Sequence, residues 1–101
     1  MIKHLKITVK GRVQGVWFRA STKQKADELE LKGFVSNLVN RNVYIEAEGT
    51  TEQLNLFVQW CKVGPKFANV SELEQEYGEL KNFNSFEKKF KFRVANILSS
   101  S

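Results

Sequence analysis

The chain has 101 residues, of which 42% are hydrophobic and 27% are charged, and its formal net charge is +5. This composition is ordinary for one globular domain spanning residues 1–101, and it includes no apolar run long enough to cross a membrane. Because the N-terminus also lacks the apolar centre of a signal peptide, we expect a cytoplasmic protein with no membrane partner, whose positive charge favours an anionic ligand.

The N-terminal third of the chain predicts a strand followed by a helix. Residues 3–10 alternate between polar and apolar side chains, which indicates a half-buried strand with His4 on its polar face. From Phe18 to Leu29 the apolar side chains recur at helical spacing, so we expect an amphipathic helix. Gly33 is the predicted stop signal of this helix.

Two short strands are predicted next, at residues 34–39 and 43–48. The sequence NRN between them, residues 40–42, favours a hairpin, because asparagine tolerates the left-handed backbone of tight turns. Glu46 and Glu48 are two residues apart on the second of these strands and therefore point the same way. A solvated strand face is the expected place for them, in preference to a pair of catalytic carboxylates.

A second amphipathic helix is predicted between residues 50 and 64. Apolar side chains from Leu54 to Cys61 follow the spacing i, i+3, i+4, i+7. Thr50 and Gln53 have the spacing of a capping box, and Gly64 is the expected end of the helix. The single cysteine cannot form an internal disulfide, and the sequence has no Cys/His cluster typical of zinc sites, so we expect no metal.

The last predicted elements are two strands. Residues 69–77 form the first, in which Val70 and Leu73 are three apart, so a bulge is expected where the alternation breaks. The sequence KKFKFRV, residues 88–94, alternates cleanly and predicts a closing strand. The element order therefore predicts an α+β, ferredoxin-like βαββαβ sandwich, with an antiparallel sheet of four to five strands and two helices on one face.

The sequence GRVQGVWFRAS, residues 11–21, joins the first strand to the first helix. A helix N-terminus presents free N–H groups and favours an anion. Gly15 allows the tight turn that an anion cradle needs, and Arg19 adds a fork of donors suited to phosphate oxygens. Alternatively, Gly15 merely permits a turn and Arg19 is a surface residue. The patterns of nucleoside-triphosphate and dinucleotide loops are absent.

This stretch resembles a known signature. GRVQGVWFR is closely similar to the acylphosphatase motif GxVQGVxFR, with every fixed position present. The similarity continues at GFVSNLVNRNVYIEAEG, GPKFANV and FEKKFKFRV, and so covers almost the whole chain. It implies a metal-free hydrolase that converts acyl phosphates to carboxylates and inorganic phosphate. In the family the hairpin usually carries a glycine, which NRN replaces here.

The resemblance also implies roles for single residues. Arg19 takes the place of the phosphate ligand, and Asn37 takes that of the second catalytic residue, which orients the attacking water. Backbone N–H groups complete the phosphate site, whose residues are Gln14, Gly15, Val16, Trp17, Phe18 and Arg19. Trp17 fills the variable position, where it either favours aromatic acyl groups or simply packs. The resemblance implies no cofactor, and we expect a monomer that binds no nucleic acid.

Two other interpretations remain open. The C-terminal sequence interleaves aromatic and basic residues, as a sheet that stacks single-stranded nucleic acid does. These residues are Phe86, Phe90 and Phe92, with Lys88, Lys89, Lys91 and Arg93. The missing glycines of the RNA-recognition motif weigh against this module. An acylphosphatase-like domain of a larger hydrogenase-maturation protein is the third interpretation, and the chain length and missing zinc-finger cysteines weigh against it.

Overall fold

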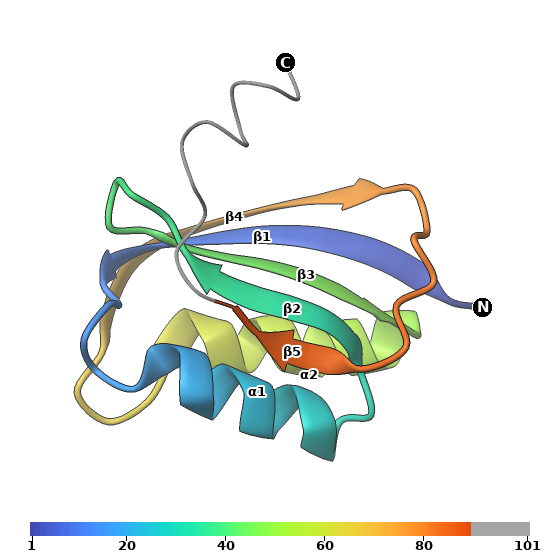
Figure 1. The fold of residues 1–101 in the computed structure, drawn as a ribbon, viewed down its shortest axis with the longest axis horizontal. Helices are drawn as coiled ribbons and strands as arrows, with labels where there is room; N and C mark the ends of the chain where they lie inside the picture. The colour runs from blue at the N-terminus through green and yellow to red at the C-terminus, as the bar shows by residue number, and fades with distance from the viewer. Residues whose placement is uncertain (90–101) are drawn as a thin grey trace.

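The computed structural model describes residues 1–89. Its elements are β1 (Lys3–Arg12), α1 (Phe18–Glu28), β2 (Lys32–Asn37), β3 (Val43–Gly49), α2 (Thr51–Val63), β4 (Asn69–Gly78) and β5 (Phe86–Lys88). The five strands form one sheet in the order β4-β1-β3-β2-β5, and both helices lie against the same face of it (Figure 1). The predicted α+β sandwich is therefore confirmed. No helix of residues 1–89 is both long and apolar enough for a membrane span.

The first four strands pair in antiparallel fashion, as predicted, whereas β5 runs parallel to β2 and makes the sheet mixed. The predicted bulge is present in β4: Lys10 of β1 pairs with Glu72 and Gly11 pairs with Val70, which leaves Ser71 as the extra residue. The predicted closing strand coincides with β5 only at Lys88, and its residues 90–94 lie outside the described part of the chain.

The core lies between the sheet and the helices, and α2 follows its prediction closely. The buried residues of α2 are Leu54, Phe57, Val58 and Cys61. Its capping box is complete, because the Thr50 hydroxyl accepts from the Gln53 N–H at 3.1 Å and the Gln53 side chain accepts from the Thr50 N–H at 2.7 Å. The helix ends at Gly64, as predicted, with φ of 73°. Each of these signals is local, which explains why the sequence predicts the helix well.

The predicted stop of α1 is wrong. The helix ends at Glu28, and Glu30 takes the left-handed conformation, with φ of 60°. The N–H groups of Glu30 and Leu31 bond back to the carbonyls of Asp27 and Ala26, which is the pattern of a Schellman motif. Gly33 instead lies inside β2, where a side chain would overlap the backbone carbonyl of Glu46 on β3. The close approach of two strands therefore requires this glycine.

The predicted hairpin joins β2 to β3, but its left-handed residue is Arg41, with φ of 75°. The asparagines act through hydrogen bonds instead. The Asn40 side chain accepts from the Asn42 N–H at 3.1 Å, and the Asn42 carbonyl accepts from the Leu38 N–H at 2.8 Å. The turn is thus held by side-chain and backbone contacts on both sides of Arg41.

The polar face predicted for His4, Glu46 and Glu48 is buried, which corrects the sequence analysis. Their exposed fractions are 1%, 5% and 5%. β4 and β5 lie at opposite edges of the sheet, and the connection between them, residues 79–85, crosses the face away from the helices, where its Lys81 and Phe83 N–H groups donate to Glu48. We call it the covering segment. It contributes Phe83, whose ring stacks on His4 with centroids 5.8 Å apart.

The covering segment supplies partners to both buried carboxylates. Glu48 accepts from the N–H groups of Lys81 and Phe83 at 2.6 and 3.1 Å, and its Oε2 lies 2.7 Å from His4 Nδ1. Glu46 Oε2 accepts from the Tyr44 hydroxyl at 2.6 Å, and its Oε1 lies 2.9 Å from His4 Nε2 and 3.2 Å from Lys81 Nζ. Burial raises the pKa of both carboxyls, but these donors and charges outweigh burial and hold each pKa below its ordinary value.

Candidate active site

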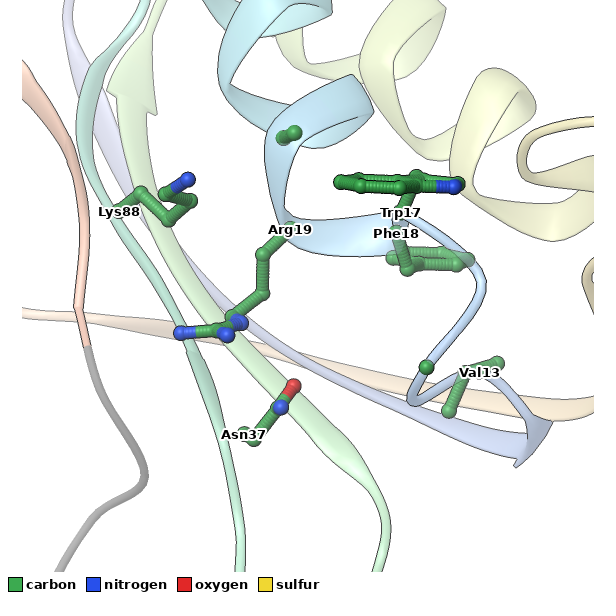
Figure 2. A pocket seen from close by; sticks show the side chains of 8 residues that line it. Val13, Trp17, Phe18, Arg19, Asn37 and Lys88 are labelled. Atoms are coloured by element: carbon green, nitrogen blue, oxygen red, sulfur yellow. The ribbon is translucent and has the colours of Figure 1, made fainter.

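A pocket of about 250 Å³ opens where the β1–α1 loop, residues 13–17, faces the end of β2 and the strand β5. Its lining residues are Val13, Gly15, Trp17, Phe18, Arg19, Ala20, Asn37 and Lys88. Figure 2 shows the Arg19 guanidinium and the Asn37 carboxamide on the same side of the loop, with the two side chains near one another. The pocket therefore brings the two predicted catalytic residues together, although they are 18 positions apart in the sequence.

The β1–α1 loop is fixed by burial at both ends of its turn. Val13 is 0% exposed and Val16 is 8% exposed, so both side chains belong to the core. Between them Gly15 has φ of 74°, and within residues 1–89 no atom beyond its two chain neighbours lies within 4 Å of where its Cβ would be. Trp17 also has a positive φ, 63°, and is 78% exposed. A large aromatic residue in a strained and solvated position is unusual enough to indicate function.

The helix that follows the loop begins without a side-chain cap. Trp17 is the N-cap residue of α1, and its side chain makes no capping hydrogen bond. The first bond of the helix runs from the Ser21 N–H to the Trp17 carbonyl at 3.0 Å, so the N–H groups of Phe18, Arg19 and Ala20 have no acceptor within the helix. The first turn also has no acidic residue. These free donors and the positive end of the helix dipole favour an anion in the pocket.

Gln14 supports the loop from outside the pocket. Its Nε2 donates to the carbonyls of Leu38 and Asn42, each at 2.9 Å, and so ties the loop to the β2–β3 hairpin. Of the predicted phosphate-binding residues, Gly15, Trp17, Phe18 and Arg19 line the pocket, whereas Gln14 and Val16 do not. The side chain of Gln14 thus positions the loop, a role that the sequence analysis did not assign.

Arg19 is oriented by the chain that follows β5. Its Nη1 donates to the backbone carbonyl of Lys89 at 2.7 Å. One nitrogen of the guanidinium is thereby fixed, and no other hydrogen bond of the group forms within residues 1–89, so its remaining donors can bind a ligand. The pairing of β5 with β2 places this carbonyl beside the pocket.

Asn37 is the last residue of β2 and pairs with Val43 of β3. Its Oδ1 is buried, and within residues 1–89 it has no hydrogen-bond partner. A buried acceptor without a donor costs about 1–3 kcal/mol. Such a group in a folded protein needs an explanation, and a ligand that donates to it in the pocket supplies one.

Val13, Ala20 and Lys88 are lining residues that the sequence analysis did not assign to the site. Lys88 belongs to the basic run near the C-terminus, and its only sequence signal was its charge. Within residues 1–89, no group of three His, Cys, Asp or Glu side chains is arranged as metal ligands would be. The pocket therefore offers backbone N–H groups, two cations and one carboxamide as its polar chemistry.

Comparisons with known proteins show the family to which this chain belongs. The family model described as Acylphosphatase matches residues 5–88. An acylphosphatase of Marinobacter nauticus is 47% identical over 81 residues, which cover 79% of this chain and 88% of the relative. The crystal structure of acylphosphatase from Bacillus subtilis superposes with a TM-score of 0.84 at 34% identity, covering 88% of this chain and 99% of that one.

A larger protein contains a similar unit. The crystal structure of full-length HypF, in its phosphate- and nucleotide-bound form, superposes with a TM-score of 0.84 at 30% identity. The match covers 90% of this chain and 12% of HypF. The fold is thus compatible both with small proteins and with a segment of a long one.

Proposed function

Because this chain belongs to the acylphosphatase family and is therefore a hydrolase of acyl phosphates, we propose specific roles for the residues of its pocket. The phosphate group binds to the backbone N–H groups between Gln14 and Arg19 and to the Arg19 guanidinium. Asn37 orients the water that attacks phosphorus. In this assignment the positive Arg19 side chain binds the anionic phosphate, and the neutral Asn37 side chain binds water in the same pocket.

The phosphate site combines three sources of positive potential. The free N–H groups at the start of α1 carry partial positive charge at the end of the helix that meets the pocket. The helix dipole adds to this positive potential. Arg19 contributes a full charge and paired donors that match phosphate oxygens. Preorganised donors of this kind contribute on the order of 3 kcal/mol each when they follow the charge that develops in the transition state.

The reaction needs positioning more than acid catalysis, because a carboxylate is already a good leaving group. The oxygen of water forms a bond to phosphorus while the bond between phosphorus and the bridging oxygen breaks, and that electron pair leaves with the carboxylate. One proton of the water stays on the new phosphate oxygen, and we infer that the bound phosphate itself, or solvent, takes the other. An acyl phosphate dianion and water thus give a carboxylate and dihydrogen phosphate when the phosphate takes this proton, or a carboxylate, hydrogen phosphate and a solvated proton when solvent takes it.

The unpaired Oδ1 of Asn37 is the observation that carries this proposal. Water bound to this acceptor lies in the same pocket as the phosphate held by Arg19, which favours an in-line attack. A neutral carboxamide accepts from water without repelling the anionic substrate. By contrast, Phe86 of the nucleic-acid interpretation is buried and packs against Phe57 of α2, so it is not available to stack a base.

The test compares the release of phosphate from benzoyl phosphate by three variants, with a chelator present. Arg19→Ala should lose both phosphate binding and turnover. Asn37→Ala should lower kcat by about 100-fold and leave competitive inhibition by inorganic phosphate nearly unchanged. Arg41→Ala, which removes the same charge from the hairpin, is the control and should retain activity. Normal turnover by Asn37→Ala would overturn the role of this residue, and loss of activity with chelator would overturn the metal-free mechanism.

We further propose that the catalytic unit is one monomeric domain of residues 1–101. Arg19 and Asn37, to which we assign the catalytic roles, line one pocket of the same chain, so each copy supplies both residues. Sedimentation of the active protein should give the mass of one chain, 11.7 kDa. A specific activity that rises with protein concentration would contradict a monomeric enzyme.

A further inference from the structure

We propose that Lys88 binds an anionic group on the acyl part of the substrate, so that the enzyme prefers acyl phosphates whose acyl group carries a carboxylate or a second phosphate. This inference rests on the proposed function, which places the transferred phosphate at the β1–α1 loop and Arg19. It assigns to β5 the recognition of the leaving group.

The placement of Lys88 follows from the sheet. Lys88 pairs with Val35 of β2, two residues before Asn37. With a rise of about 3.3 Å per residue and about 4.8 Å between strands, its Cα is about 8 Å from that of Asn37. A lysine side chain spans most of this distance, so its ammonium group can reach a substrate whose phosphate lies beside Asn37.

The direction of the side chain follows from the alternation along β5. Phe86 is 3% exposed and faces the core between the sheet and the helices, and Lys88, two residues on, shares that face. Lys89 points to the other face, where its Nζ lies 4.4 Å from the centre of the Phe34 ring. Of these two neighbouring lysines, only Lys88 therefore lines the pocket.

Charge gives the second argument. None of the eight lining residues is acidic, and within residues 1–89 no carboxylate forms an ion pair with Lys88. In Figure 2, Arg19 lies between Lys88 and the loop that carries Val13. When the phosphate is bound by the loop and Arg19, Lys88 lies on the opposite rim of the pocket. The acyl group of the substrate leaves the pocket on that side. A cation at this position attracts an anionic acyl group more than a neutral one.

The test uses two substrates that differ by one charge, benzoyl phosphate and 4-carboxybenzoyl phosphate. Lys88→Gln should lower kcat/KM for the carboxylated substrate by about fivefold, the size typical of an exposed ion pair, and leave the neutral one within about twofold. Lys88→Glu should lower kcat/KM for the carboxylated substrate by about 25-fold, because the attraction between residue 88 and the carboxylate becomes repulsion. In the unmodified protein, the preference for the carboxylated substrate should also weaken when salt is raised from about 10 mM to about 1 M, because the screening length falls from about 30 to about 3 Å.

Lys32→Gln is the matched control. Lys32 is exposed at the other end of β2, so this variant changes the net charge equally without touching the pocket, and the ratio of the two substrates should not change. An equal loss for both substrates in Lys88→Gln, or no loss for either, would overturn the role of Lys88 at the acyl group. Failure of the unmodified protein to hydrolyse benzoyl phosphate would instead contradict the proposed function.

Discussion

The Arg19 guanidinium donates from Nη1 to the backbone carbonyl of Lys89 at 2.7 Å, across 70 positions of the sequence. This bond joins the first turn of α1 to the chain that leaves β5. Both elements also supply lining residues, so the same contact that orients the arginine closes one side of the pocket. The planar, fixed geometry of arginine is thereby used for structure on one nitrogen and remains available for a ligand on the others.

Arg19→Lys should therefore lower kcat/KM for benzoyl phosphate by about 100-fold, although the charge is kept. Lysine is a flexible point charge, which cannot bond to the Lys89 carbonyl and hold a phosphate oxygen with a rigid fork at the same time. Steady-state kinetics and phosphate inhibition measure the effect. Arg12→Lys, an exposed change at the end of β1, is the control. A loss of less than about threefold in Arg19→Lys would show that charge alone suffices, against the fork that we propose.

Asn37→Ala should leave the protein as stable as before, or more stable, while activity falls. The buried Oδ1 has no partner within residues 1–89, so its removal abolishes an unsatisfied acceptor, which offsets the lost contacts of the side chain. Thermal unfolding measures this outcome. A Tm lowered by about 5 °C or more, which corresponds to about 1 kcal/mol in a domain of this size, would indicate that Asn37 has a structural role instead.

The sequence predicted most reliably the features that depend on neighbouring residues. The capping box of Thr50 and Gln53 and the end of α2 at Gly64 require only contacts within one helix. The signature loop was likewise recognised as a continuous stretch, and its Arg19 lines one pocket with Asn37 of β2. Local chemistry is visible in a sequence because the interacting residues are a few positions apart.

Two features that the sequence did not predict depend on distant segments. Nothing near His4 or Glu48 indicates that residues 79–85 cross over them, because the crossing follows from the order of the strands in the sheet. Lys88 enters the pocket through the parallel pairing of β5 with β2, which its own sequence does not specify. The burial of His4 and Glu48 and the position of Lys88 in the pocket thus depend on the topology of the sheet.

Glu30 and Gly33 predict opposite effects of substitution on the free energy of unfolding. Glu30 has φ of 60° at the position where a Schellman motif normally has glycine, so Glu30→Gly should raise the free energy of unfolding by about 1 kcal/mol. Gly33→Ala should lower it by about 3 kcal/mol, because the new Cβ would overlap the Glu46 carbonyl. Denaturant unfolding of both variants measures these changes.

Gly15→Ala measures the cost of backbone strain without the cost of steric overlap, and so serves as the control for Gly33→Ala. Gly15 also has a left-handed backbone, but in the described part of the chain only its two chain neighbours come within 4 Å of its Cβ position. Its substitution should therefore cost only the conformational term, about 1 kcal/mol. If Gly33→Ala cost no more than Gly15→Ala, the close approach of β2 and β3 would not be the reason for the glycine.

The carboxylates beneath the covering segment predict how stability depends on pH. Burial raises the pKa of Glu48, but the N–H groups of Lys81 and Phe83, together with His4, lower it more, so its pKa in the folded protein is below the ordinary value of 4.5. The pKa of Glu46 is also below its ordinary value. A carboxyl with a lower pKa in the folded state stabilises that state fully above its unfolded-state pKa, and this contribution is lost as the pH falls through the folded-state value.

The free energy of unfolding should therefore decrease as the pH falls below about 4.5, where the first of these carboxyls begins to bind a proton in the unfolded chain. Glu48→Gln should lower stability at neutral pH by about 2 kcal/mol, since charge-assisted hydrogen bonds to two N–H groups become neutral ones, and should flatten the acid limb of the profile. Glu79→Gln, at an exposed position of the same segment, is the control. An acid limb as steep in Glu48→Gln as in the unmodified protein would mean that other carboxyls govern the acid transition.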